Sequence, residues 1–157
     1  MITIIRDYTL EDVKASLKDF LEKAANSEEV RELGVKIVYG QQDHIAAVYT
    51  WVKSNVDYIP DPEGIELITS PVKMVRDYNE GKPLAEDCDG MAILTTALYR
   101  SVGIKSNVVL LDTVGEGYDH AVSRAYSDKL GSWIIADVST SKIPLGWEIS
   151  HVRRLMI

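Results

Sequence analysis

Hydrophobic positions up to residue 102 recur with a period close to 3.6, which is typical of amphipathic helices. This spacing predicts helices over residues 9–26, 28–39, a stretch that begins after Asp43, 71–78 and 88–102. Polar residues that cap helix starts precede the first, third and fourth of these segments, and Gly103 can end the last one. Two prolines and a glycine predict a loop over 58–64.

Beyond residue 103 the pattern changes to extended apolar runs. These runs predict strands over 106–112, 119–127 and 132–139, with a turn at 128–131 and a final short strand within 150–157. Helices followed by consecutive strands predict an α+β fold, in which N-terminal helices pack on a mostly antiparallel sheet. Because no repeat or linker interrupts residues 1–157, we expect a single domain.

Composition and charge narrow the function classes. The hydrophobic and charged fractions, 46% and 26%, are ordinary for a globular domain, and no segment approaches the roughly 20 apolar residues that span a membrane. A net charge of −7 argues against nonspecific binding to nucleic acid. The first residues lack the pattern of a signal peptide, so we expect a cytoplasmic protein or one that belongs to an assembly built there, such as a phage particle.

The chain has one cysteine, which excludes an internal disulfide and a zinc site built on several thiolates. A lone cysteine is usually a small buried hydrophobe. Cys88, however, begins a predicted helix, where unpaired backbone N–H groups and the helix dipole favour a thiolate. Glu86, Asp87 and Asp89 act in the opposite direction, because negative charge raises a thiol pKa. A reactive thiol here therefore needs a nearby imidazolium.

Of the three histidines, His44 and His151 lie near the start of the third helix and near the C-terminus, where surface or packing roles are common. His120 opens a strand, and Asp137 is a single carboxylate near the end of the next apolar strand. If the two strands form a hairpin, Asp137 lies near His120 and can orient the imidazole. The sequence therefore predicts Cys88 as nucleophile, His120 as base and Asp137 as the orienting acid, and the register remains an assumption.

Three segments together resemble the transglutaminase-like superfamily: 86–94 around the cysteine, 119–122 around the histidine, and 133–137, which runs from a tryptophan to the aspartate. The resemblance covers about residues 45–140 and extends to the order Cys, His, Asp. It implies a papain-like core and acyl transfer through a thioester, with cleavage or formation of amide bonds. The stretch from Tyr58 to Asp89 is more similar to bacterial and phage-associated members. Glu86 stands where a small residue, often glycine, is commoner.

These observations lead to an enzyme that acts on a peptide or protein substrate by thiol-dependent acyl transfer or amide hydrolysis, without cofactor or metal. The backbone N–H of Cys88 is the natural first oxyanion donor, and Tyr58 is a candidate for the second. Two alternatives remain: a catalytically silent binding or structural module on the same fold, for instance within a phage or prophage particle, and a zinc site made of Cys88, His120 and Asp137.

Overall fold

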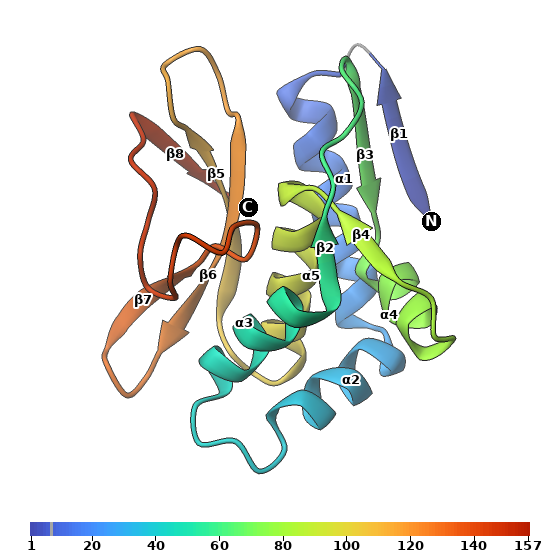
Figure 1. The fold of residues 1–157 in the computed structure, drawn as a ribbon, viewed down its shortest axis with the longest axis vertical. Coiled ribbons are helices and arrows are strands. Elements are labelled where there is room, and N and C mark those ends of the chain that lie inside the picture. Colours follow the sequence, from blue (N-terminus) through green and yellow to red (C-terminus); the bar gives the residue numbers. More distant parts are fainter. Residues whose placement is uncertain (7) are drawn as a thin grey trace.

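A computed structural model describes residues 1–6 and 8–157 (Figure 1). Its helices are α1 (Leu10–Ala25), α2 (Glu28–Val38), α3 (His44–Asn55), α4 (Pro71–Asn79) and α5 (Cys88–Ser101). Its strands are β1 (Ile2–Arg6), β2 (Val56–Tyr58), β3 (Ile65–Thr69), β4 (Leu84–Glu86), β5 (Ser106–Asp112), β6 (His120–Ser127), β7 (Ser132–Ala136) and β8 (Arg153–Met156). The mixture of N-terminal helices and later strands confirms the α+β prediction.

The four strands of the C-terminal part form one antiparallel sheet in the order β7-β6-β5-β8. The sheet occupies one side of the molecule, and the helices lie beside it (Figure 1). Two smaller pairs complete the fold, an antiparallel pair of β1 with β3 and a parallel pair of β2 with β4. The expectation of a mostly antiparallel sheet is confirmed.

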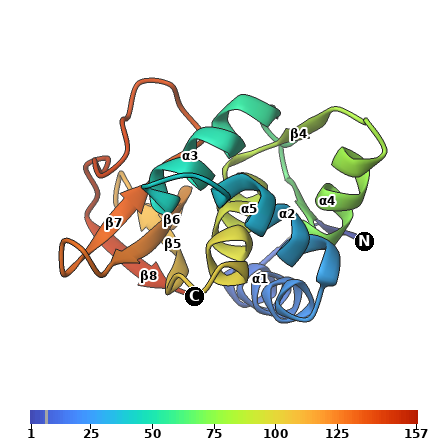
Figure 2. The ribbon, with the colours of Figure 1, turned by 90° about the horizontal axis from the view of Figure 1, so that it is seen from below.

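Helix α5 is the centre of the molecule, with β5 and β6 on one side and α1, α2 and α3 on the other (Figure 2). It is apolar around most of its circumference, as a fully buried helix must be, and Leu94 and Leu98 have no exposed surface. Two hydrogen bonds fix its position. Thr96 Oγ1 lies 2.8 Å from Ser123 Oγ on β6, and the Tyr99 hydroxyl donates to the Ile45 carbonyl at 2.8 Å. The first residue of α5 is thereby held against the start of β6.

The helix boundaries follow the local capping signals. Thr9 forms a reciprocal capping box with Asp12, and Ser70 and Asp87 cap α4 and α5. Gly103, with a φ of 81°, takes the left-handed conformation just after α5. The predicted helices agree with the structure to within one or two residues. None of the helices in the described part of the chain is both long enough and apolar enough to cross a membrane.

The strand predictions were less complete. The pattern predicted neither β1 nor β3, which pair with each other across more than fifty residues of sequence, nor the short parallel pair of β2 and β4. The strand expected over 132–139 ends at Ala136, and the final strand is only Arg153–Met156. Strand β7 ends early because the Asp137 side chain turns the backbone by accepting a hydrogen bond from the N–H of Ser139.

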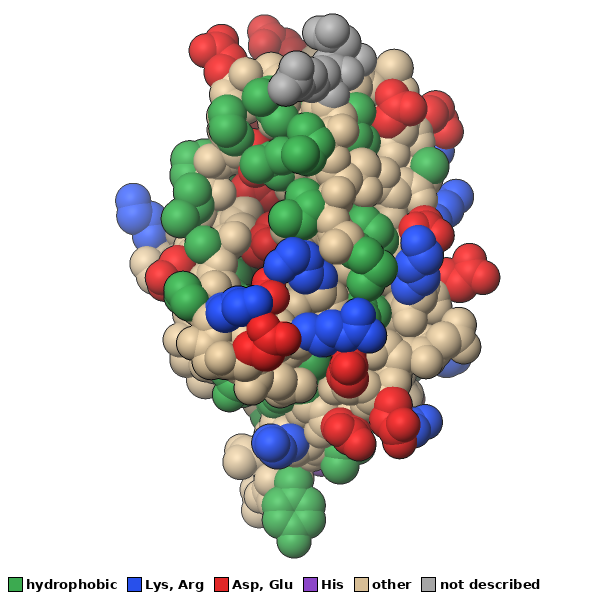
Figure 3. All heavy atoms as spheres, turned by 90° about the vertical axis from the view of Figure 1, so that its right-hand side faces the viewer, with side chains coloured by type: hydrophobic (Ala, Val, Ile, Leu, Met, Phe, Trp, Pro, Cys, Tyr) green, Lys and Arg blue, Asp and Glu red, His purple; other side chains and the backbone are tan. Residues whose placement is uncertain are grey.

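The face formed by β1 and α4 is mixed in character (Figure 3). Its apolar part includes Ile2 and Ile4 on β1, which are 50% and 62% exposed. In its charged part, groups of opposite sign lie together, as in the Arg76 Nε–Glu29 Oε2 pair at 2.7 Å and the Lys82 Nζ–Glu80 Oε2 pair at 2.6 Å. Most of these groups are exposed, so each pair contributes little to stability.

Candidate active site

A cavity of about 500 Å³ opens between the N-terminus of α5 and the start of β6. Cys88 and His120 both line it, so the fold brings together two residues that are 32 positions apart (120 − 88) in the sequence. Neither of the other histidines belongs to its lining. His44 begins α3, and His151 lies before β8, where its ring faces Glu148 and the Ile149 carbonyl.

Cys88 is the first residue of α5 and is half-buried. The Asp87 side chain caps the helix, because its Oδ1 accepts hydrogen bonds from the backbone N–H groups of Asp89 and Gly90 at 3.1 and 3.3 Å. The Cys88 N–H belongs to the same first turn, before the intrahelical hydrogen bonds begin. The thiol itself donates to Asp89 Oδ1 at 3.7 Å. The position is therefore the helix start that the sequence predicted.

The pKa of the Cys88 thiol is not lowered, as the helix dipole alone would lead one to expect. Burial, followed by the negative charges of Asp89 and Asp87, raises the pKa of the Cys88 thiol well above its ordinary value. The backbone N–H of Ala121 opposes this shift without cancelling it. The thiol is therefore protonated in the resting protein, and its reactivity depends on a base that removes the proton as the reaction proceeds.

His120 has the partner that such a base needs. Its Nε2 lies 2.8 Å from Asp137 Oδ2, and Asp137 is only 1% exposed. The antiparallel register that pairs Ser123 with Ala136 brings these two side chains together, so the hairpin assumed from the sequence is present. The other oxygen of Asp137 accepts from the Ser139 N–H at 3.2 Å and from the Ser139 hydroxyl at 2.7 Å.

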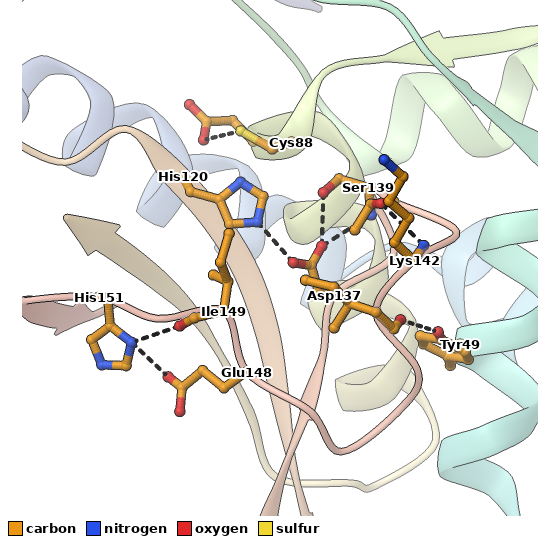
Figure 4. A network of polar contacts seen from close by, with 12 residues as sticks. Tyr49, Cys88, His120, Asp137, Ser139, Lys142, Glu148, Ile149 and His151 are labelled. Carbon is orange, nitrogen blue, oxygen red and sulfur yellow. Dashed lines mark hydrogen bonds and ion pairs between the residues drawn. The ribbon is translucent and has the colours of Figure 1, made fainter. Parts of the chain in front are cut away.

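The pair is arranged for an ionised aspartate. Burial alone would raise the pKa of Asp137, but hydrogen bonds from His120 and Ser139 lower it below its ordinary value. Burial alone would lower the pKa of His120, but the hydrogen bond and charge of Asp137, with smaller contributions from Asp119 and Asp89, raise it. An ionised carboxylate only accepts, so Nε2 carries the proton, and Nδ1 of the neutral ring can accept one. The His120 ring lies between Cys88 and Asp137 in Figure 4.

The parallel pair of β2 and β4 places two further residues. Its register sets Tyr58 beside Glu86, just before α5. Tyr58 lines the cavity, and burial together with Cys88 and Asp87 raises the pKa of its hydroxyl, which stays protonated and able to donate. Glu86 faces another cavity and packs over Gly90, where an added Cβ would come within 2.3 Å of Glu86 Oε2. Glu86, although larger than the residue that is commoner at this position, therefore does not cover the sulfur of Cys88.

A second group of carboxylates lies in the cavity wall. Asp61, Glu66 and Asp87 each place an oxygen within 4.8 Å of the other two. Glu66 is 8% exposed, and its Oε1 has no hydrogen-bond partner in the described part of the chain. No local pattern predicted this group, since Asp61 belongs to a loop and Glu66 to the unpredicted strand β3.

Two other residues of the site were missed. Ser139 completes the hydrogen bonding of Asp137, and Asp119 accepts from the Thr113 N–H at 2.8 Å and raises the pKa of His120. An Asp-x-Ser segment after an apolar strand is a recognisable signal for a side-chain-capped turn, which could have identified Ser139. The position of Asp119 beside His120 carries no comparable signal.

The comparisons with known proteins agree with this arrangement. Residues 31–138, more than half of the chain, match the model of the transglutaminase-like superfamily, and the chain belongs to that superfamily. The search of curated proteins found no match.

Two solved structures show the same fold. A candidate cysteine protease from Cytophaga hutchinsonii matches with a TM-score of 0.55 and 22% identity, over 88% of this chain and 49% of its own. A candidate protease from Parabacteroides distasonis matches with a TM-score of 0.55 and 13% identity, over 88% of this chain and 31% of its own. The chain thus spans about half and about a third of these two proteins.

Proposed function

We propose that this protein is a cysteine acyl-transfer enzyme, a hydrolase or transferase of amide bonds, in which Cys88, His120 and Asp137 form the catalytic triad. The observation that carries the proposal is the 2.8 Å hydrogen bond between His120 Nε2 and the buried Asp137, behind the cavity that Cys88 lines. Peptide or protein amides are the proposed substrates, and we place the enzyme in the cytoplasm or in a phage-type assembly built there.

In the proposed reaction, Nδ1 of His120 accepts the thiol proton while the Cys88 sulfur attacks the amide carbonyl. The resulting imidazolium donates this proton to the leaving amine as the C–N bond breaks, which leaves a thioester on Cys88. Water or a second amine then attacks the thioester, and His120 first accepts the proton of that nucleophile and then returns it to the sulfur. Asp137 remains ionised and stabilises the imidazolium in both half-reactions.

The oxyanion of each half-reaction needs donors that are already in place. The Cys88 N–H in the first turn of α5 is the first donor in this proposal, and the Tyr58 hydroxyl is the second. Replacing Tyr58 with phenylalanine removes only that hydroxyl. We expect Tyr58→Phe to slow acylation by about 10²-fold with little change in stability, because Tyr58 is half exposed. An unchanged rate would remove Tyr58 from the oxyanion site.

The proposal is tested with 4-nitrophenyl acetate, an acyl donor that needs no knowledge of the natural substrate. We expect a burst of nitrophenolate of about one equivalent and an acetyl group on Cys88 by mass spectrometry. Cys88→Ala should abolish the burst, and His120→Ala should slow it by at least about 10²-fold. His151→Ala is the matched control, since His151 lies outside the cavity. A burst that His120→Ala leaves unchanged would contradict the proposal.

One observation favours a second candidate, a silent binding module on the same fold. Burial and then the carboxylates next to Cys88 raise the pKa of its thiol, which suits an inert residue as well as one that waits for substrate. In that case Cys88 would not be acylated, and the His120–Asp137 pair would serve stability alone. The same acylation experiment separates the two candidates.

A further inference from the structure

The cavity that Cys88 lines is rich in negative charge. The carboxylates among its lining residues are Asp61, Glu66, Asp87, Asp89 and Asp119. Within the described chain, Arg153 is the one lysine or arginine that lines it, and its Nε already pairs with Asp112 Oδ2 at 2.8 Å. The protein itself therefore balances little of this charge, and the cavity favours a substrate that carries a positive group.

Three of these carboxylates form a compact group, and one of them has an oxygen without a partner. Asp61, Glu66 and Asp87 each place an oxygen within 4.8 Å of the other two. Asp61 Oδ2 accepts from the Leu67 N–H at 2.6 Å, and Asp87 Oδ1 accepts from N–H groups of α5, so both side chains are held in place. Glu66 lines the cavity and is 8% exposed, and its Oε1 has no hydrogen-bond partner among residues 1–6 and 8–157. A buried oxygen of this kind favours a ligand that brings N–H donors.

The spacing of the group suits a guanidinium. Two acceptors that bond to the two hydrogens of one planar NH2 group, each about 2.8 Å from the nitrogen, lie about 4.8 Å apart. A guanidinium presents five N–H donors in one plane, whereas an ammonium presents three. A guanidinium is also the more weakly hydrated of the two, so it loses less when it enters a buried site. The group therefore fits an arginine side chain better than a lysine side chain.

The surroundings of the group favour the same ligand and place it close to the nucleophile. Tyr8 lines the cavity, and burial, followed by the charges of Glu66 and Asp89, raises the pKa of its hydroxyl, so the ring lies near the group and stays neutral. Aromatic rings attract guanidinium groups. Burial, Asp89 and Asp87, with a smaller contribution from Glu66, also raise the pKa of the Cys88 thiol. The group therefore acts on the sulfur and lies in the same part of the cavity.

We propose that Asp61, Glu66 and Asp87 bind the guanidinium of a substrate arginine, the residue that carries the carbonyl attacked by Cys88. Asp87 directly precedes Cys88, and consecutive Cα atoms are about 3.8 Å apart, so a side chain on the acyl residue can reach the group. Without a substrate the group holds protons at neutral pH, because the pKa of Glu66 is raised to about 9 and that of Asp87 to about 7. The bound guanidinium replaces one of these protons. This inference rests on the proposed acylation of Cys88 and names its substrate class.

Acylation rates with matched esters test the specificity. The 4-nitrophenyl esters of Nα-acetylarginine and Nα-acetylcitrulline differ in charge but hardly in shape. We expect kcat/KM for the arginine ester to exceed that for the citrulline ester by at least about tenfold, with the lysine ester slower than the arginine ester. In a protein that 4-nitrophenyl acetate acylates, equal rates for arginine and citrulline, or a lysine ester that reacts as fast as the arginine ester, would overturn this inference and leave the proposed function in place.

Matched variants locate the guanidinium site. Glu66→Gln and Asp61→Asn keep the shapes of the side chains, and each should lower kcat/KM for the arginine ester by at least about tenfold. The citrulline ester should react at nearly its native rate in both variants, because it carries no charge. Glu63→Gln is the control, since Glu63 is exposed in the same loop region and does not line the cavity. An undiminished preference for arginine in both folded variants would overturn the assignment.

Binding without chemistry separates this inference from the proposed function. The Cys88→Ala chain cannot be acylated, and calorimetric titration should show that it binds Nα-acetylarginine amide at least about tenfold more tightly than Nα-acetylcitrulline amide. Equal affinities would overturn the guanidinium site whatever the acylation rates are. Tighter binding of the arginine amide, together with no nitrophenolate burst from the native chain, would support the site and contradict the proposed function alone.

Discussion

Asp137 and Glu66 are both buried carboxylates near Cys88, with 1% and 8% of their surfaces exposed, yet their electrostatics are opposite. Asp137 receives hydrogen bonds from His120 and Ser139, and its pKa falls below the ordinary value. Glu66 has an oxygen without a hydrogen-bond partner among the residues that the structure describes, and burial raises the pKa of Glu66 to about 9. Burial acts in the same direction on both groups, so the difference comes from the donors that surround them.

The two sides of the cavity therefore differ in how they hold negative charge. The β6–β7 hairpin holds a permanent negative charge that orients and stabilises a histidine. The wall formed by the loop after β2, by β3 and by the cap of α5 gathers negative charge without balancing it. An unbalanced group of this kind lowers stability unless a cation or protons compensate it.

The largest effect is expected from Asp137→Asn. The amide carries no negative charge, and its NH2 group can face Nε2 in place of an accepting oxygen. It then favours the histidine tautomer with the proton on Nδ1, so acylation of Cys88 should slow by about 10³- to 10⁴-fold. The rate of the nitrophenyl acetate burst measures this effect. Asp128→Asn in the exposed turn between β6 and β7 is the control and should leave the rate unchanged. A loss of less than about tenfold would mean that Asp137 does not act through His120.

On the other side, Glu66→Gln should stabilise the protein at neutral pH. The substitution removes an ionisable group whose pKa is raised by burial, so the free energy of unfolding should rise by about 1–3 kcal/mol. Urea denaturation at neutral pH measures the change. Glu63→Gln should stay within about 0.5 kcal/mol of the native protein. A lower free energy of unfolding for Glu66→Gln would show that the surroundings of Glu66 stabilise its carboxylate in the native protein.

The pH dependence of stability distinguishes the two sides again. Glu66 and Asp87 have folded-state pKa values of about 9 and about 7, above their ordinary values, so the folded state binds more protons than the unfolded one over this range. The free energy of unfolding should therefore fall by several kcal/mol, at about 1.4 kcal/mol per pKa unit, between about pH 5 and about pH 9. The raised pKa of His120 acts in the same direction.

Asp137 has the opposite dependence at lower pH. Because its folded-state pKa is depressed, its stabilising contribution is present above its ordinary pKa and is lost only as the pH falls through the folded value. Urea denaturation across the pH range should thus show a second decline on the acid side. Glu66→Gln should flatten the alkaline decline and leave the acid one. A native protein that becomes more stable from about pH 5 to about pH 9 would contradict this assignment.

The smallest effect is expected from Ser139→Ala. The variant removes one of the hydrogen bonds to Asp137 and makes this carboxylate slightly more like Glu66. The free energy of unfolding should fall by about 1 kcal/mol, and acylation should slow by less than about tenfold. Thr140→Ala is the control, because Thr140 Oγ1 accepts a hydrogen bond from the Lys142 N–H in the same turn and not from His120 or Ser139. Equal effects of the two variants would remove Ser139 from the support of Asp137.

The two sides also differ in how far the sequence could predict them. Cys88, His120 and Asp137 lie on elements with strong local signals: a helix start, the first residue of a strand and a hairpin with a recognisable turn. In the opposite wall, strand pairing brings Asp61, Glu66 and Asp87 together, and local hydrophobic periodicity does not predict that pairing. Strand β3 is short and pairs with the distant β1, and its buried position 66 holds a carboxylate, so its apolar residues do not follow the alternation of a half-buried strand.

For Cys88 the sequence predicted the position in the fold but not the pKa of the thiol. Its place in the first turn of α5 follows from local sequence, and so do the neighbouring carboxylates Asp87 and Asp89. The outcome of their competition with the helix dipole depends on burial, which is set by the packing of α5 against β6 and could not be obtained from spacing. Burial, followed by the charges of Asp89 and Asp87, raises the pKa of the Cys88 thiol.

The rate of iodoacetamide alkylation of Cys88 at neutral pH tests the central claim most directly. It should be compared in the native chain, in His120→Ala and in the control His151→Ala. We expect His120→Ala to react at least about tenfold more slowly and His151→Ala to react like the native chain, because His120 lines the cavity with Cys88 and is the proposed acceptor of the thiol proton, whereas His151 lies outside that cavity. Equal rates in all three proteins would contradict the account and leave Cys88 as an ordinary half-buried thiol.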